Sequence, residues 1–401
     1  MKKYDITQPV RLKKGVYDLN SESNFNYQLN RVINWDGGRI EDVAPIAAKI
    51  KVSADWKREL IALGDRAMNE ERTENAIAYY RMSEFFMYDG DPDKKKYYLK
   101  ATVLFYQYYA DYFEGENPVI EKFEVPFEGV KLPVMHTVPE TKSKGIILIH
   151  GGNDSYFEEF LFTILYLREK GFEVYMFEGP GQGECIRLHG VPLIIEWEKP
   201  VMTVTEYFDL HDAILVGQSL GGFFAPRASA FDDRVTKCVS IAQFGALKMN
   251  FYDNAFVNGL IWGMLNVFLF LFGWLINILY AAKKGRRMPF FRTYFHRMGT
   301  TNIYRLAKIL WSVDLCPISD RLTKDYLVIG GSRDTMACRA GIGRHLFLLK
   351  NARSVSSREI TMHEQGADHC CCGNQTAVMD TVLLWAELME RRDRSLEDCG
   401  E

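Results

Sequence analysis

A Gly-x-Ser-x-Gly sequence at 217–221 is the first feature of this chain that suggests chemistry. Residues 213–222 read AILVGQSLGG, so an apolar run precedes Ser219 and a helical pattern follows it. In a strand–turn–helix of this kind the glycines permit a very tight turn, and the strained serine presents its hydroxyl above the sheet. An ordinary glycine turn is the alternative interpretation. The strand before and the helix after Ser219 favour a nucleophilic serine.

A serine hydroxyl becomes reactive when a base takes its proton and a carboxylate orients that base. The expected chain order is serine, acid, histidine, each placed after a successive strand. A strand predicted at 326–330 leads to Asp334, and one predicted at 359–363 leads to His369. We therefore predict Asp334 as the acid and His369 as the base.

Two other residues compete for these roles. His363 is a second candidate base, but the pattern places it inside the strand, where a core or surface histidine is the plainer interpretation. Asp320 is a second candidate acid, although no strand precedes it. Both are weaker candidates because a catalytic group belongs beyond the carboxyl end of a strand.

The negative oxygen formed during acyl transfer needs N–H donors that already point at it. One donor is expected from the backbone of Leu220, directly after the serine. The other is expected from the glycine-rich loop at 150–154, where we favour Gly152 and then Asn153. His150 is expected to brace this loop.

The sequence FEGPGQG at 177–183 resembles a nucleotide loop only superficially. It lacks the lysine of a phosphate loop and the spacing of G-x-G-x-x-G. We expect a tight turn beside the site. Glu178 is either a carboxylate that faces the pocket or a structural residue.

The cysteines do not suggest a metal or a disulfide framework. Three of the eight are adjacent, at 370–372, and none forms a CxxC pair. Adjacent side chains cannot all face one ion, so small buried apolar roles at the start of the last helix are expected. No metal and no cofactor are predicted.

The surrounding pattern predicts an α/β fold with a doubly wound, mostly parallel sheet. Helical periodicity appears at 54–70, 73–87 and 94–113, and strands and helices alternate from about 119 onward. We predict an N-terminal helical region at 1–118, a hydrolase core at 119–245 and 319–395, and an apolar helical cap insert at 246–318.

The segment 256–282 carries no charge and is long enough to span a bilayer. Lys283, Lys284, Arg286 and Arg287 follow it. A single span would separate Ser219 from Asp334 and His369, so two shorter buried helices of a cap are favoured, with Trp262 and Phe268 as candidate pocket residues. Membrane contact through 256–282 is left open.

Composition places the chain among globular proteins. The formal net charge of −3 argues against nucleic-acid binding, and no signal peptide is visible behind the basic N-terminus. We predict a cytoplasmic protein with a small-molecule substrate, and a homodimer is left open.

The chain resembles the α/β-hydrolases that carry an N-terminal helical region. Members include fungal polyketide-shortening hydrolases of pigment synthesis, the dihydroxypseudooxynicotine C–C hydrolase and the fermentation–respiration switch esterases. The matching sequences are HGGNDSYFEE, FEGPGQGE, WEKPV, GQSLGGFFAPRASAFDDRV, GGSRD and GADHC. The resemblance implies the same nucleophile, acid and base, and implies that the N-terminal helices and the insert jointly cover the pocket. Asp368 departs from an expected glutamate.

These patterns predict a serine hydrolase that cleaves an ester-type acyl bond of an apolar or aromatic small molecule. The alternatives are a C–C bond hydrolase acting on a β-diketone-like ketone and an aminopeptidase-like amidase. A non-enzymatic alternative is a helical interaction module on an inert hydrolase scaffold.

Overall fold

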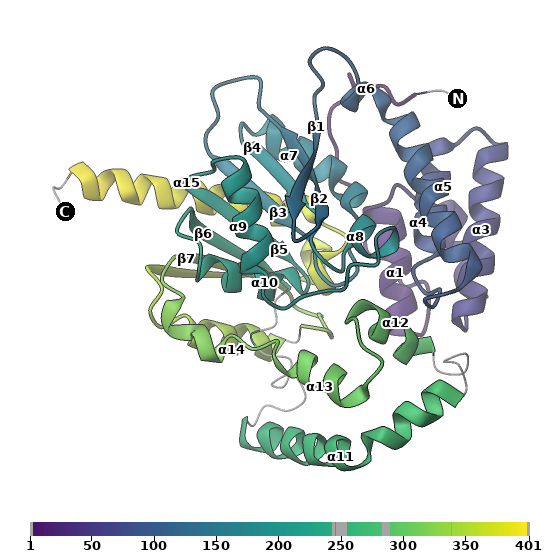
Figure 1. Ribbon diagram of the computed structural model, residues 1–401. Helices are drawn as coiled ribbons and strands as arrows, with labels where there is room; N and C mark the ends of the chain where they lie inside the picture. Colours follow the sequence, from purple (N-terminus) through teal and green to yellow (C-terminus); the bar gives the residue numbers. More distant parts are fainter. Residues whose placement is uncertain (1–2, 243–244, 246–254, 283–288, 338, 399–401) are drawn as a thin grey trace.

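The computed structural model describes residues 3–242, 245, 255–282, 289–337 and 339–398. The helical N-terminal region lies on one side of a central sheet, and the helical insert lies along an adjoining side of the molecule, next to the N-terminal helices (Figure 1). The predicted start of the insert at 246 and the basic residues at 283–287 lie outside the described residues.

Six helices form the N-terminal region. They are α1 (Ser23–Asn34), α2 (Ile40–Ala47), α3 (Ser53–Asn69), α4 (Thr73–Ser83), α5 (Pro92–Tyr108) and α6 (Ala110–Phe113). Trp56 is fully buried, and its indole N–H donates to the carbonyl of Met82 at 2.7 Å. A Cβ on Gly64 would lie 2.4 Å from the Tyr80 ring, so this glycine lets α3 and α4 pack closely.

An eight-stranded sheet forms the centre of the molecule, in the order β1-β2-β4-β3-β5-β6-β7-β8. Its strands are β1 (Glu121–Phe127), β2 (Val130–Thr137), β3 (Ile146–His150), β4 (Glu173–Phe177), β5 (Ala213–Gln218), β6 (Val235–Ile241), β7 (Asp325–Gly331) and β8 (Ser354–Ile360). Only the pairs β1–β2 and β2–β4 are antiparallel. The prediction of a mostly parallel sheet is confirmed.

Helices cover both faces of this sheet (Figure 1). The core helices and 3₁₀ turns are η1 (Phe157–Phe160), α7 (Leu161–Glu169), α8 (Gly183–Arg187), α9 (Glu198–Tyr207), α10 (Gly221–Ser229), α14 (Arg339–Leu348), η4 (Met362–Glu364), η5 (His369–Cys371) and α15 (Gln375–Asp398). Residues of α7 and α15 bury one apolar cluster, and residues of α9 and α10 bury another. Because an apolar core packs on each face of the sheet, the carboxyl ends of its strands, which lead into the loops of the site, are held in fixed positions.

The last strand differs from its prediction. β8 covers 354–360, whereas the sequence pattern suggested 359–363. The cause is an exposed edge: most of β8 alternates between partly buried and exposed residues, so it lacks the apolar run that marks a central strand. His363 consequently lies in η4, is exposed, and is not inside a strand.

The insert between β6 and β7 also differs from its prediction. It contains α11 (Ala255–Ala282), α12 (Pro289–Arg297), α13 (Ile303–Trp311) and η3 (Cys316–Arg321). The expected pair of short buried helices is wrong, because the apolar segment forms one 28-residue helix. Its glycines are tolerated within the helix, and most of its side chains face outward. Among the described residues, α11 alone is long and apolar enough to cross a membrane by length and composition.

Buried ion pairs join the N-terminal helices to the core. Arg31 on α1 pairs with Glu159 on η1 at 2.6 Å, and both side chains are almost fully buried. Glu84, at the end of α4, accepts from Lys94, from Arg187 of α8 and from the Tyr156 hydroxyl. The N-terminal region is thereby fixed to the loops at the edge of the sheet where β3 and β5 end.

Candidate active site

Ser219 sits in a strained turn between β5 and α10. Its φ is +60°, a left-handed conformation that is costly for a residue with a side chain. A Cβ on Gly217 would lie 2.0 Å from the carbonyl oxygen of Gly221, and one on Gly221 would lie 2.6 Å from that of Gly151. The two glycines are therefore required by contact, as the sequence pattern predicted.

Three side chains from distant parts of the chain form one hydrogen-bonded series. The Oγ of Ser219 lies 2.9 Å from Nε2 of His369, and Nδ1 of His369 lies 2.8 Å from Oδ2 of Asp334. Asp334 follows β7, and His369 lies in η5 after β8. The structure thus brings together the three residues that the sequence singled out.

The surroundings of Asp334 keep it ionised. Burial alone would raise the pKa of this carboxyl, but His369 and two backbone N–H groups lower it below its usual value. Those N–H groups belong to Met336 and Ala337, and both donate to Oδ1 at 2.8 Å. One oxygen is thereby held by the backbone, which leaves the other to orient the imidazole.

The imidazole of His369 is held as a strong base. Burial disfavours its cation, yet the neighbouring Cys370 and the Asp334 carboxylate raise its pKa well above the ordinary value of 6.5. A raised pKa means that the neutral form, which can accept a proton from Ser219, is reached only at higher pH.

The loop after β3 presses against the serine turn. A Cβ on Gly152 would lie 2.7 Å from both the Cβ of Ser219 and the backbone nitrogen of Leu220. Gln182 anchors the loop from the other side, because its Nε2 donates to the carbonyls of Gly151 and Gly152 at 2.8 Å each. The sequence analysis did not identify Gln182 as functional, although it lies within the quoted FEGPGQGE sequence.

The two candidate oxyanion donors in this loop, Gly152 and Asn153, differ in whether their backbone N–H is already hydrogen-bonded. The N–H of Gly152 donates to the Ser155 hydroxyl at 2.7 Å, so it is already occupied. In the described part of the chain, the backbone N–H groups of Asn153 and Leu220 make no hydrogen bond. The geometry therefore favours Leu220 with Asn153 over Leu220 with Gly152.

His150 and Glu178 act as supports beneath the loops. His150 is fully buried with Nδ1 3.1 Å from the Gly151 carbonyl, and burial lowers its pKa to about 4. The two oxygens of Glu178 accept from the backbone N–H groups of Phe157 and Glu184 at 2.8 and 2.7 Å. Both oxygens of Glu178 thus accept from backbone N–H groups, so this carboxylate has the structural role and does not face the pocket as a free group.

The N-terminal helix α1 contributes a wall to the site. The ring of Tyr27 lies 5.6 Å from that of His369 in an edge-to-face arrangement. One turn further on, Arg31 contacts Asp154 of the loop after β3. No local motif marks Tyr27 in the sequence, since its role depends on how α1 docks.

The two candidate pocket residues of the insert lie elsewhere. Phe268 is half exposed on α11, in a hollow lined by residues of that helix and by none of Ser219, Asp334 and His369. Trp262 packs edge-to-face on Trp311 of α13. Neither residue lies beside Ser219, His369 and Asp334, because α11 lies on the outside of the insert.

α12 is the part of the insert that approaches the site. Burial lowers the pKa of Arg297 despite the nearby carboxylate of Asp154, which opposes the shift. At the other end of the helix, Arg292 stacks over Tyr88 of the N-terminal region. α12 therefore lies between the N-terminal helices and the loop after β3.

The rival residues lie apart from the series. Asp320 is exposed in η3 and pairs with Lys350 at 2.9 Å. Asp368, next to His369, faces Arg333 at 3.7 Å. The cysteines at 370–372 are buried in the turn just before α15, and no group of three or more potential ligands in the described ranges is arranged to hold a metal ion.

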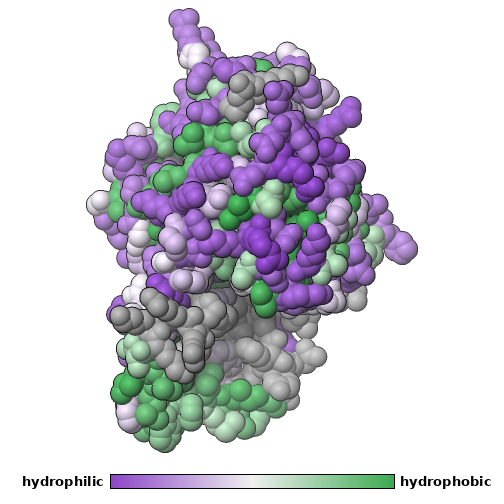
Figure 2. Space-filling model, turned by 90° about the vertical axis from the view of Figure 1, so that its right-hand side faces the viewer, coloured by the Kyte–Doolittle hydropathy of each residue, from purple (hydrophilic) through white to green (hydrophobic). Residues whose placement is uncertain are grey.

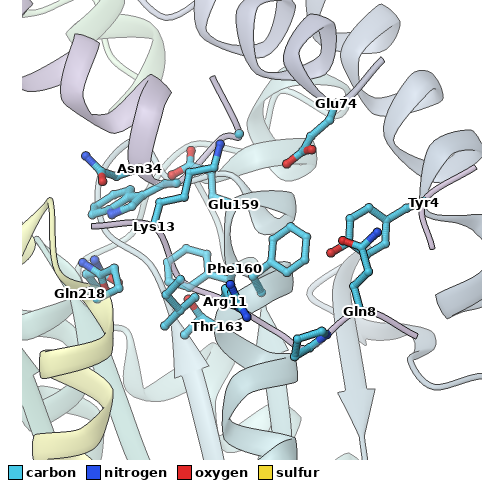
Figure 3. Close-up of a pocket in the computed structure, with 16 residues that line it drawn as sticks. Tyr4, Gln8, Arg11, Lys13, Asn34, Glu74, Glu159, Phe160, Thr163 and Gln218 are labelled. Carbon is cyan, nitrogen blue, oxygen red and sulfur yellow. The ribbon is translucent and has the colours of Figure 1, made fainter. Parts of the chain in front are cut away.

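A cavity of about 250 Å³ lies behind the serine turn (Figure 3). Its lining includes Lys13 and Glu74 from the N-terminal region, and Glu159 of η1 and Gln218 at the end of β5 from the core. Ser219 is not among the lining residues. The cavity is thus distinct from the face of the turn that carries the nucleophilic candidate.

Comparison with known proteins points to one family. The profile of the Alpha/beta hydrolase family matches residues 146–377. The chain is 28% identical to the alpha/beta hydrolase psoB of Aspergillus fumigatus over 316 residues, covering 67% of this chain and 68% of that one. It is 29% identical to the hydrolyase poxO of Penicillium oxalicum over 55% of this chain and 60% of that one, so the match spans less than two thirds of this second relative.

Another relative and two solved structures extend the comparison. The 20-hydroxy-prefusarin hydrolase FUS2 of Gibberella moniliformis is 25% identical over 64% of this chain and 70% of its own. The structure of the 2,6-dihydroxy-pseudo-oxynicotine hydrolase matches with a TM-score of 0.57 at 18% identity, covering 89% of this chain and 94% of that one. AbyA5 matches with a TM-score of 0.60 at 17% identity, covering 84% and 85%. At these identities the two structures show a shared fold.

Proposed function

Because the chain belongs to the Alpha/beta hydrolase family, we propose that this hydrolase uses Ser219, His369 and Asp334 to cleave an acyl bond. The substrate class we assign is an ester of an apolar or aromatic small molecule. The observation that carries the proposal is the series of contacts of 2.9 and 2.8 Å from Ser219 through His369 to Asp334.

The first half of the reaction forms an acyl-enzyme. Nε2 of His369 takes the hydroxyl proton while Oγ of Ser219 bonds to the substrate carbonyl carbon. The carbonyl oxygen becomes negative and accepts from the backbone N–H groups of Leu220 and Asn153. The bond to the leaving group then breaks, and the imidazolium gives its proton to the departing oxygen.

The second half releases the acid. Water gives a proton to His369 as its oxygen bonds to the acyl carbon, and the same two N–H groups stabilise the second negative oxygen. The bond from the acyl carbon to Oγ breaks, and Ser219 regains a proton from the imidazolium. Asp334 stays ionised throughout and stabilises the cationic imidazole.

The test is replacement of the nucleophile. We expect Ser219→Ala to abolish labelling by a fluorophosphonate and to lower ester turnover by at least about 10³-fold, because no other group replaces the attacking oxygen. Ser395→Ala, on α15, is the matched control and should label as the wild type does. Labelling of Ser219→Ala at the wild-type rate would refute the assignment.

A C–C bond hydrolase is the second candidate. The same three residues serve an attack on a ketone carbonyl, and the resemblance to the 2,6-dihydroxy-pseudo-oxynicotine hydrolase extends over 89% of this chain. Assaying a p-nitrophenyl ester, an aminoacyl anilide and an aryl diketone side by side separates the ester, amide and C–C activities. Faster turnover of the diketone than of the ester would favour the second candidate.

A further inference from the structure

α11 presents a broad apolar surface to the outside of the molecule. Within its segment Gly259–Ala282, an 18-residue stretch has a mean hydropathy of 2.0, and 11% of that stretch is buried. Phe270, Trp274 and Ile278 are 67%, 55% and 56% exposed. Apolar side chains gather at the same end of the molecule in Figure 2. Soluble proteins rarely expose so large a contiguous patch, which normally marks an interaction surface.

The distribution of polar and apolar side chains on α11 is the reverse of that on a surface helix of a soluble protein. Its contact with α13 uses Leu269 and Gly273, which are buried, together with Asn277, whose side-chain oxygen accepts from the N–H of Ile303 at 2.9 Å. Asn266 is also on the partly buried side. Among the described side chains of α11, those that are exposed are all apolar. Polar groups face the protein, and apolar groups face outward.

The exposed arc is too wide for a helix-to-helix interface. At 3.6 residues per turn, the exposed positions between 264 and 279 cover roughly 220° of the helix circumference. A helix that packs on a protein partner needs an apolar stripe of about 100°. A lipid environment contacts the whole outward side of a helix, and it therefore fits this arc better than a second copy of the chain.

The topology excludes a transmembrane arrangement. β6, which precedes α11, and β7, which follows it, are neighbouring parallel strands of one sheet. A span would put these paired strands on opposite sides of the membrane. α11 therefore fits a bilayer only when it lies parallel to the surface.

The charge of the insert complements an anionic surface. Residues 254–313 contain eight lysines and arginines and no aspartate or glutamate, although the whole chain has a formal charge of −3. Four of these cations, at 283–287, follow α11 directly in the sequence. Basic residues beside an apolar helix are attracted to acidic lipid headgroups.

We propose that α11 is an in-plane anchor that inserts its apolar side into one leaflet of an anionic membrane. The occupant of this surface is a lipid bilayer rather than a protein. The proposal concerns binding and does not depend on the catalytic assignment, since its test uses no turnover.

Vesicle flotation tests the apolar contribution. The full-length chain should float with vesicles of phosphatidylcholine and phosphatidylglycerol. The triple variant Phe270→Ser, Trp274→Ser, Ile278→Ser should reduce the bound fraction by at least about tenfold, because three apolar side chains no longer enter the leaflet. The control is Leu384→Ser with Leu388→Ser, two exposed leucines on α15, which should float as the wild type does.

A second variant tests the electrostatic contribution. Replacing Lys283, Lys284, Arg286 and Arg287 by glutamine should weaken binding to the anionic vesicles, and so should 0.5 M salt. Failure of the wild type to float, or equal flotation of the α11 triple variant, would overturn the proposal. A lipid-free dimer that the same triple variant dissociates, without vesicle binding, would overturn it as well and assign the surface to a second copy.

Discussion

At the scale of single residues, the site depends on backbone contacts that leave no room for a side chain. Gly152 is the clearest example, because the loop that contains it touches both Ser219 and Leu220. Its N–H donates to the Ser155 hydroxyl, so Asn153 is the donor we propose, and the position of Asn153 depends on the absence of a Cβ on Gly152. Gly152 therefore matters for the spacing between the two loops.

Substitution of Gly152 tests this spacing. We expect Gly152→Ala to lower kcat for ester hydrolysis by about 10²-fold or more, since displacement of one oxyanion donor has an effect of that size. Gly343→Ala on α14, where a Cβ would meet nothing within 4 Å, is the control and should retain activity. The measurement is steady-state kinetics with thermal melts of both variants. Unchanged kcat in Gly152→Ala would contradict the contact.

The pH profile should reflect the environment of His369. Its pKa is raised, so the imidazole is protonated and unable to accept a proton at pH values below that pKa. We expect kcat/KM to fall as the pH is lowered, with a midpoint above the ordinary histidine value of about 6.5. A profile measured from pH 5 to 10 checks this, and a midpoint at or below 6.5 would contradict it.

Ser219, Asp334 and His369 could be identified from the sequence because each lies in a motif at a strand end. The choice between Gly152 and Asn153 could not, because it depends on one hydrogen bond to Ser155 that no pattern reveals. Tyr27 could not either, since its contact with His369 is a tertiary one.

At the scale of the elements, one carboxylate holds two turns in place. Glu178 follows β4 and accepts from the N–H of Phe157, the first residue of η1, and from the N–H of Glu184, the second residue of α8. A Cβ on Gly183 would lie 1.6 Å from its Oε1, so this glycine leaves space for the carboxylate. The sequence FEGPGQG thus forms a structural turn. Through Glu178 and Gln182 it fixes the loop after β3 and the start of α8 in place.

Glu178→Gln tests this support. The amide would point an N–H₂ group at one of two backbone N–H donors, so one donor would be left without an acceptor. We expect a loss of about 1–3 kcal/mol in the free energy of unfolding. Glu140→Gln, at an exposed position, should change it by less than about 0.5 kcal/mol. Chemical denaturation of both variants gives the comparison, and equal stabilities would contradict the role.

The elements themselves were predicted unevenly. The strands β3, β4, β5 and β7 each contain a run of at least four apolar residues, so their positions followed from the sequence, whereas the exposed edge strand β8 was misplaced. Two short buried helices were expected in place of α11 because a single span would have separated Ser219 from Asp334 and His369. The Asn277 side chain in fact accepts a hydrogen bond from the N–H of Ile303, the first residue of α13, a contact that no local pattern reveals.

At the scale of the whole molecule, the N-terminal helices and the core form one unit through buried charge. Glu84 is the central residue, since it pairs with Lys94 within the N-terminal region and with Arg187 of the core. These cations surround Glu84 and lower its pKa to about 2 despite its burial. Its removal would leave buried cations without a partner.

We expect Glu84→Ala to reduce the free energy of unfolding by about 3–5 kcal/mol, because breaking a buried pair leaves the opposite charge uncompensated. Glu124→Ala removes an exposed pair with Lys131 and should change stability by about 0–1 kcal/mol. Denaturant titration of both variants measures the difference. A small effect at Glu84 would contradict its role in joining the N-terminal helices to the core.

The cytoplasmic location and a homodimer remain predictions at this scale. Vesicle binding through α11 is compatible with a cytoplasmic protein that visits an inner membrane surface, because the in-plane arrangement crosses no bilayer.

The connection from β6 to β7 can be replaced during evolution without disturbing the sheet. Two adjacent parallel strands can be joined by a crossover of about a dozen residues, and here the same junction contains everything from Ile241 to Asp325. The sheet would close equally well around a short polar crossover. If α11 holds the protein on a membrane as proposed, exchange of this single connection would release the molecule into bulk solvent without altering the strands that align Ser219, Asp334 and His369.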